Sequence, residues 1–288
     1  MIRALGIGDN VCDKYRHMGK MFPGGQALNF AVYCRLEGHT SGYIGVIGSD
    51  TAAKHIQHIL RELSVDMSYV RQYERENGYA IIDLVDGERH FVASNKGGVL
   101  REHPLRLTEQ DISYISSFDI AHTSNNSYLD DLLPQFVPLP TFISYDFSGR
   151  WQEKPEWVRE ICRFIDFGFL SCGELPEKLV KEQLEIMGRW GCDIVIATLG
   201  SRGAIVWDGM EYHFFRPVPV KAVDTLGAGD SMAAGFLMHY IECEKSGLPE
   251  QGSEAYRTLI RQALEAGGRL AAKTCMMQGS FGYGRALD

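Results

Sequence analysis

Short runs of apolar residues alternate with amphipathic stretches along most of this chain. Five of these runs are typical of strands buried on both faces of a parallel sheet, and they lie at residues 4–7, 43–47, 142–145, 167–170 and 194–197. Apolar side chains at three- and four-residue spacing predict helices over residues 52–63, 177–189 and 256–275. Strands that alternate with helices in this way predict the α/β class, as a three-layer α/β/α sandwich with a mostly parallel central sheet.

One segment departs from this alternation. Residues 78–84 and 89–93 are two short β-like runs joined by Asp86 and Gly87, and this dipeptide is a strong hairpin signal. Residues 12–21 are expected to add another extended piece. We therefore expect a single domain over residues 1–288, with a small β lid formed by segments near 12–21 and 78–95.

Composition and charge limit the kinds of molecule that this protein is expected to bind. The chain has 288 residues, of which 45% are hydrophobic, and its net charge of -8 disfavours nucleic acid and anionic membranes. No run of about 18 apolar residues occurs, so we expect no membrane span. The seven cysteines are scattered and form no C-x-x-C motif, which argues against a zinc site or a disulfide framework. The N-terminus has no signal-peptide pattern, and a cytoplasmic protein is expected.

The strongest chemical signal is the run DTLGAGD at residues 224–230, which leads directly into a predicted helix. Gly227, Ala228 and Gly229 have almost no side chain, so their backbone N–H groups can face an anion at the positive end of the helix dipole. Asp230 is placed to accept a proton from an attacking hydroxyl. Phosphoryl transfer requires this combination, because it depends mainly on alignment and on prearranged dipoles. The alternative, a glycine turn with Asp230 as helix cap, does not explain the flanking Asp-Thr pair.

Other loops that follow predicted strands are also rich in glycine or acidic residues. Near the N-terminus, Gly24 and Gly25 open a helix that carries Asn29, and Asp9 and Asp13 follow the first strand. Further along are the run TLGSRG at residues 198–203 and the run SCGE at residues 171–174. Each run alone could be an ordinary turn, whereas together they indicate a site at the carboxyl ends of the strands.

From residue 8 to about residue 282, the chain resembles the PfkB (ribokinase-like) carbohydrate kinases. The resemblance implies a ribokinase-like fold and ATP-dependent transfer of a phosphoryl group to a sugar hydroxyl. By resemblance, the catalytic base is Asp230, and the anion hole is formed by Gly227, Ala228 and Gly229. The same resemblance assigns the sugar to Gly24, Gly25, Asn29 and Asp13, with Asp9 as a nearby candidate whose alternative role is a hydrogen-bonded turn.

The nucleotide side of the site also follows from the resemblance. It places Thr198, Gly200 and Gly203 along the ATP phosphates, together with Thr225 of the 224–230 run. Ser171 stands where the family usually has Asn, and Glu174 is the expected support for Mg²⁺. Asp224 is the expected neighbour of a monovalent cation such as K⁺. In many members of the family the lid also pairs two subunits, so a homodimer through the lid is expected.

Within the family, the chain most resembles the members that phosphorylate the 6-hydroxyl of a fructosyl-amino acid such as fructoselysine. This likeness rests on residues 8–10 with Asp13 and Tyr15, on residues 31–34, on residues 146–148 with Trp151, and on residues 271–274. Arg89 and Lys96 could then meet the carboxylate of the amino acid. Kinases for fructose, 2-keto-3-deoxygluconate or a nucleoside remain open. So does a protein of another class, which senses a sugar without chemistry.

Overall fold

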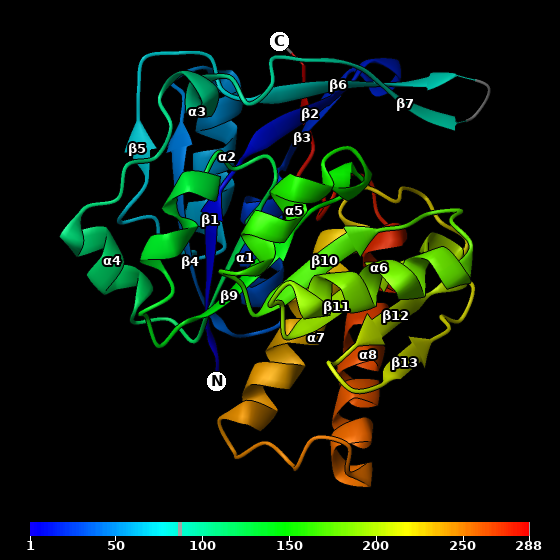
Figure 1. Cartoon of the computed structure of the whole chain (residues 1–288). Coiled ribbons are helices and arrows are strands. Elements are labelled where there is room, and N and C mark those ends of the chain that lie inside the picture. Colours follow the sequence, from blue (N-terminus) through cyan, green and yellow to red (C-terminus); the bar gives the residue numbers. More distant parts are fainter. Residues whose placement is uncertain (86–87, 288) are drawn as a thin grey trace.

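The computed structural model describes residues 1–85 and 88–287, and the side chains of residues 84–90 are not described. Within this part of the chain, nine strands form a central sheet in the order β13-β12-β11-β10-β9-β8-β1-β4-β5 (Figure 1). Their bounds in chain order are β1 Arg3–Gly8, β4 Thr40–Ile47, β5 Arg71–Gln72, β8 Ile120–Ser124, β9 Phe142–Asp146, β10 Phe167–Ser171, β11 Ile194–Thr198, β12 Ala204–Trp207 and β13 Tyr212–Phe215.

The sheet is parallel from β5 to β11 and antiparallel only where β12 and β13 are added. The five strands predicted from apolar runs are confirmed as β1, β4, β9, β10 and β11. Strand β8 was not predicted, because its sequence IAHTS is half polar although the strand is buried. Its His122 is stacked on Phe30 and donates to or accepts from Ser144 Oγ, so packing rather than sequence pattern makes this segment a strand.

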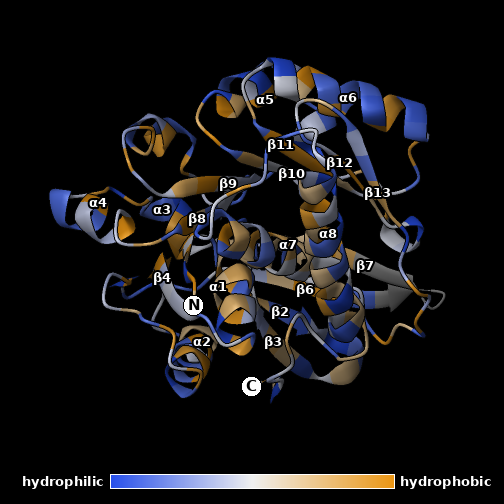
Figure 2. Ribbon diagram, turned by 90° about the horizontal axis from the view of Figure 1, so that it is seen from below, coloured by the Kyte–Doolittle hydropathy of each residue, from blue (hydrophilic) through white to orange (hydrophobic). Residues whose placement is uncertain are grey.

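Helices cover both faces of the central sheet and complete the three predicted layers. One face packs against α1 Gln26–Leu36, α2 Thr51–Glu62, α7 Ala228–Glu244 and α8 Glu254–Cys275. The other face packs against α3 Val99–Glu102, α4 Glu109–Ile115, α5 Pro155–Cys162 and α6 Glu177–Arg189. Along β11, Ile194 and Ile196 enter the first core while Val195 and Ala197 enter the second, as the two-residue period of a strand requires. Figure 2 shows the apolar strands between the layers and the polar outer side of α6.

A second, smaller sheet has the strand order β14-β3-β2-β6-β7 among the described residues. Its strands are β2 Val11–Tyr15, β3 Lys20–Gly24, β6 Tyr79–Val85, β7 Glu88–Ser94 and β14 Arg285–Ala286. Strands β6 and β7 pair antiparallel as predicted, whereas the predicted turn at Asp86 and Gly87 lies outside the described residues. Figure 1 shows this sheet across the end of the molecule toward which the parallel strands point. The C-terminal β14, which pairs with β3, was not predicted.

Four short 3₁₀ turns complete the described elements, at η1 Arg16–Met18, η2 Asp130–Gln135, η3 Arg150–Gln152 and η4 Gly200–Arg202. No helix in the described part of the chain is long and apolar enough to cross a membrane. The described cysteines, which include all seven of the sequence, are free thiols.

Helices α7 and α8 cross at a point where both backbones lack side chains. A Cβ added to Gly267 would lie 2.6 Å from the carbonyl oxygen of Met232, and a Cβ added to Gly235 would lie 2.7 Å from the Cα of Gly267. Because the obstacles are backbone atoms, they cannot rotate away. The close approach of these two helices fixes where α7, and with it residue 230, stands relative to the sheet.

Replacing Gly267 by Ala should therefore destabilise the protein. Forcing the helices apart should lower the free energy of unfolding by about 2 kcal/mol, which outweighs the gain of about 1 kcal/mol in helix propensity. Urea unfolding measures the change, with Gln262→Ala on the exposed side of α8 as the control. Equal stability of the Gly267 variant and the control would show that the helices do not depend on this contact.

Candidate active site

Two cavities meet at the loop that precedes α7. The larger cavity, of about 1030 Å³, is bounded by the ends of β1, β9 and β10, the start of α1 and strands of the small sheet. The smaller cavity, of about 380 Å³, is bounded by the β11–β12 turn, the 215–222 segment and α8. Thr225 and Gly229 line both cavities. A group bound in one cavity can therefore reach a group bound in the other only past this loop.

The loop presents backbone rather than side chains to the cavities. Gly227 is the N-cap of α7 in a left-handed conformation with φ of 76°, and no side chain caps the helix. A Cβ on Gly227 would lie 2.6 Å from the hydroxyl of Tyr33, so the tight turn excludes other residues. A Cβ on Gly229 would meet nothing within 4 Å, and Ala228 lines the smaller cavity. The N–H groups of Gly227 and Gly229 have no partner among the described residues and are left for an anion, whereas the N–H of Ala228 donates to the carbonyl of Thr225 at 3.3 Å.

Asp230 stands in the first turn of α7 and lines the larger cavity, with only 8% of its surface exposed. Asn29 Nδ2 donates a hydrogen bond of 2.6 Å to Asp230 Oδ2. Burial raises the pKa of Asp230 well above the usual carboxyl range, the negative charge of Asp146 raises it further, and the bond from Asn29 opposes both effects. A carboxylate with a raised pKa is a stronger base once it is ionised, which suits abstraction of a hydroxyl proton.

The predicted sugar residues come together in the larger cavity, but they serve different purposes. Asp13, Gly25 and Asn29 line it. Gly24 does not, and its importance is steric, because a Cβ there would collide with the carboxylate of Asp13. The Oδ1 atom of Asn29 is buried without a hydrogen-bond partner among the described residues, so it is available to accept a hydroxyl.

Asp9 also lines the cavity, but its carboxylate is largely occupied by the protein. Oδ2 accepts the backbone N–H of Gln26, and Oδ1 accepts that of Ala27 together with the hydroxyls of Ser124 and Ser127. Asp9 therefore caps the N-terminus of α1 from the end of β1. This geometry favours the hydrogen-bonded turn, the alternative role weighed for this residue, over direct binding of a sugar.

The smaller cavity contains most of the predicted nucleotide residues. Thr198, Gly200, Gly203 and Thr225 all line it. Gly203 adopts φ of 102°, and a Cβ there would collide with the carbonyl of Phe215, so the turn needs glycine. The remaining wall is mainly apolar and includes Phe215, Pro217, Val218, Val220, Met232, Ala271 and Ala272. An apolar slot beside an uncapped helix N-terminus suits a purine nucleotide with its phosphates toward the loop.

Three residues expected on the nucleotide side do not line the smaller cavity: Ser171, Glu174 and Asp224. Ser171 lines the larger cavity instead of the nucleotide cavity, because it ends β10 in the middle of the sheet. Glu174 is exposed in the turn after β10 and lines neither cavity. The carboxylate of Asp224 accepts bonds from Tyr15 Oη at 2.6 Å and from the N–H groups of Leu226 and Gly279 at 3.0 Å each. These side chains alone do not form a cage for a divalent metal.

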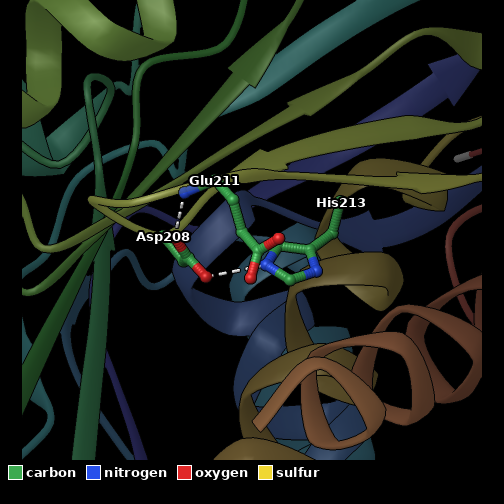
Figure 3. A group of neighbouring side chains, drawn as sticks. All are labelled: Asp208, Glu211 and His213. Carbon is green, nitrogen blue, oxygen red and sulfur yellow. Dashed lines mark hydrogen bonds and ion pairs between the residues drawn. The ribbon is translucent and has the colours of Figure 1, made fainter. Parts of the chain in front are cut away.

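One cluster of potential metal ligands does occur in the described part of the chain, at the end of the sheet opposite the two cavities. Asp208, Glu211 and His213 lie in the β12–β13 hairpin and point toward one another (Figure 3). Each has a protein partner: Asp208 Oδ2 bonds His213 Nε2 at 2.7 Å, and Glu211 Oε1 pairs with Arg257 Nε at 2.7 Å. Asp208 Oδ1 accepts two backbone N–H groups of the turn. The cluster therefore stabilises the hairpin, and it borders a separate cavity of about 700 Å³.

Several residues of the larger cavity were not assigned from the sequence. Asp146 at the end of β9 is 6% exposed, and burial raises its pKa to about 6. Its position directly after a predicted strand could have identified it. Gln26 links the wall, since its Nε2 donates to Ser148 Oγ and its Oε1 accepts from Asn126 Nδ2. No pattern in the sequence indicates such pairs, because their members come from separate loops.

Comparison with known proteins identifies the family. The profile of the pfkB family carbohydrate kinases matches residues 5–139 and 170–278. The chain belongs to this family. It is therefore a carbohydrate kinase that uses ATP. Kinases of this kind generally also use a divalent metal.

Relatives within the family share most of the chain. The fructosamine kinase FrlD of Bacillus subtilis is 38% identical over 98% of this chain and 94% of its own. The fructoselysine 6-kinase of Escherichia coli is 34% identical over 96% of this chain and 98% of its own. Among solved structures, a ribokinase from Giardia lamblia has a TM-score of 0.78 at 17% identity, covering 98% of this chain and 95% of its own. This structural likeness confirms the ribokinase-like fold.

Replacing Gly229 by Ala should reduce turnover without destabilising the fold. The new methyl group is compatible with the helix but points into the space between the two cavities, where it displaces a bound phosphate. We expect kcat to fall at least about 10-fold, while the melting temperature stays the same or rises. Gly149→Ala is the matched control, since its methyl also meets nothing within 4 Å and residue 149 lines neither cavity. Wild-type kcat in the Gly229 variant would contradict the proposed position of the phosphate.

Replacing Asp230 by Asn should stabilise the protein at high pH but not at low pH. Because burial raises the pKa of Asp230, the folded state keeps a proton that the unfolded chain releases. The stability from this group is complete below the ordinary carboxyl pKa and is lost as pH rises through the folded pKa. Asn removes this loss, so near pH 8 the variant should melt at least about 2 °C above the wild type, which corresponds to about 1 kcal/mol.

Calorimetric melting temperatures near pH 8 and near pH 3 test this prediction. The two proteins should converge at the lower pH, where Asp230 is protonated in both states. If the two melting temperatures differ by the same amount at both pH values, the Asp230 carboxyl has the same pKa in the folded and the unfolded protein.

Proposed function

We propose that this kinase transfers the terminal phosphoryl group of ATP to the 6-hydroxyl of fructoselysine or a related fructosyl-amino acid. The observation that carries the proposal is the meeting of two cavities at Thr225 and Gly229, with the buried base Asp230 on the acceptor side. The substrate class is supported by relatives that are 38% and 34% identical over nearly the whole chain and whose names are fructosamine kinase and fructoselysine 6-kinase. Fructokinases of the family are more distant, at 24% and 25% identity.

In the proposed reaction, the sugar binds beside Asp13 and Asn29 with its 6-hydroxyl toward Asp230. Asp230 accepts the hydroxyl proton as the oxygen attacks the terminal phosphorus, the bond from that phosphorus to the bridging oxygen breaks, and ADP leaves. The N–H groups of Gly227 and Gly229, which have no partner among the described residues, stabilise the negative charge that develops on the phosphoryl oxygens. Asn29 serves twice, since it orients the Asp230 carboxylate through Nδ2 and offers Oδ1 to the sugar.

We assign Mg²⁺ as the divalent metal and Glu174 as its support through water, since Mg²⁺ commonly keeps several waters when it is bound to phosphates. Mg²⁺ would neutralise charge on the phosphates of ATP. A K⁺ ion beside Asp224 is part of the same proposal, and it would share the carboxylate with the donors from Tyr15, Leu226 and Gly279.

We further propose that the small sheet acts as a lid that excludes water and pairs two subunits in the cytoplasm. Strand β7 is an edge strand of this sheet, and its Phe91 and Val92 are 63% and 49% exposed. An exposed apolar edge strand is a natural surface for pairing with a second copy. The free cysteines are compatible with a reducing compartment.

Release of ADP across a panel of acceptors tests the substrate. With Mg²⁺ present, kcat/KM for fructoselysine should exceed that for fructose, 2-keto-3-deoxygluconate and nucleosides by at least about 10-fold, because only fructoselysine also carries the amino-acid end. Removal of Mg²⁺ should abolish turnover. Comparable kcat/KM for fructose would overturn the fructosyl-amino acid assignment.

The variant Asp230→Asn distinguishes an enzyme from a sugar sensor in the same assay. It should lose at least about 10²-fold in kcat because the general base is gone, while it still binds nucleotide. Full activity in this variant would remove Asp230 from the mechanism.

A further inference from the structure

The lining of the larger cavity contains both buried carboxylates and exposed cations. Four carboxylates, each at most 8% exposed, line its wall near the phosphoryl loop: Asp9, Asp13, Asp146 and Asp230. Three exposed cations line its rim: Lys96, Arg101 and Arg150. The lining of this cavity of about 1030 Å³ thus combines buried negative side chains with exposed positive ones. An acceptor that uses both carries hydroxyls for the carboxylates and an anion for the cations.

The three rim cations differ in their partners. Arg150 is paired with Glu153 at 3.7 Å. In the described part of the chain, the side chains of Lys96 and Arg101 have neither a hydrogen-bond partner nor an ion-pair partner. Glu102, the acidic neighbour of Arg101, is paired with Arg75 at 3.6 Å instead. Lys96 and Arg101 are therefore the rim cations whose charge is available to a ligand.

The turn that carries Lys96 and Arg101 is held in place by the protein. Asn95 Nδ2 donates to the carbonyl of Asn77 at 2.7 Å, and Asn95 Oδ1 accepts the N–H of Tyr79 at 2.9 Å. The hydroxyl of Tyr128 donates to the carbonyl of Lys96 at 2.7 Å. On the other side, Val99 and Leu100 of α3 are 1% exposed and anchor the turn in the core.

Backbone conformation adds to this constraint. Gly98 adopts φ of 52°, and a Cβ there would lie 2.6 Å from the carbonyl oxygen of Asn77. Side chains attached to an anchored backbone lose less entropy when they bind than side chains on a free loop. The turn at Lys96 and the helix α3 at Arg101 thus place an ammonium and a guanidinium group in the exposed lining of the larger cavity.

We propose that Lys96 and Arg101 bind the carboxylate at the end of the acceptor remote from the attacking hydroxyl. The proposal rests on the proposed function and adds the rule by which this kinase chooses among glycated amines. A guanidinium binds a carboxylate through paired hydrogen bonds, and an ammonium adds a point charge. Free fructosyl-amino acids are therefore selected, and fructosyl amines that lack a carboxylate are disfavoured. Arg89, which the sequence also suggested for this role, has no described side chain.

The test compares fructoselysine with fructosylcadaverine, the same molecule with hydrogen in place of the carboxylate. For the wild type, kcat/KM should be about 10-fold higher for fructoselysine, mainly through KM, since bonds between charged groups are among the stronger ones. The difference should shrink as salt is raised, because these cations are exposed.

Variants assign the effect to particular residues. Arg101→Gln and Lys96→Gln should each raise KM for fructoselysine by about 5- to 10-fold and leave KM for fructosylcadaverine unchanged. Arg101→Lys should recover part of the loss. Arg150→Gln is the matched control on the same rim, and its KM for fructoselysine should stay within about 2-fold of wild type because Arg150 is already paired.

The outcomes separate this inference from the proposed function. Equal kcat/KM for the two fructosyl amines, or variants that affect both of them alike, would overturn the role of Lys96 and Arg101 while the kinase still acts on fructosyl amines. Turnover of fructose with none of either fructosyl amine would overturn the proposed function and this inference with it.

Discussion

The site depends on a helix start at which the N–H groups of Gly227 and Gly229 have no partner in the described part of the chain. Helix α7 begins at Gly227 without a side-chain cap, directly beside the buried carboxylate of Asp230. Uncapped N–H groups attract an anion, while a buried carboxylate repels one and is itself costly to ionise. In the function proposed above, these opposing demands are met in one turn of helix because the phosphate approaches from one cavity and the hydroxyl from the other. The rest of the fold holds this turn in position.

Helix α1 also starts after a glycine that offers no side-chain cap, but the protein itself satisfies its first N–H groups. Asp9 reaches from the end of β1 and accepts the N–H groups of Gln26 and Ala27. The negative charge that α7 leaves to the substrate is thus supplied to α1 by the protein. This capping fixes α1, and α1 carries Asn29 to the carboxylate of Asp230. One helix start serves stability, and we propose that the other serves catalysis.

The sequence revealed the parts of this protein that depend on local pattern. Apolar runs predicted the inner strands, and the glycines of residues 224–230 predicted the tight turn that leads into α7, because both signals are confined to a few consecutive residues. The role of Gly24 and the occupation of Asp9 could not be predicted, since they depend on contacts with residues elsewhere in the chain. The same is true of Lys96 and Arg101: exposed cations are common in any sequence, and only the cavity distinguishes these two.

The C-terminal segment joins the two sides of the site, and this has a practical consequence. After α8, Gly279 donates to Asp224, Ser280 accepts a hydrogen bond from Asn29, and β14 pairs with β3 in the small sheet. Met1 is 81% exposed, and the first residues lie at the far end of the molecule from β14 (Figure 1). An affinity handle or fluorescent fusion is best attached to the N-terminus, because one that follows β14 would lie against the small sheet, whose strands line the larger cavity.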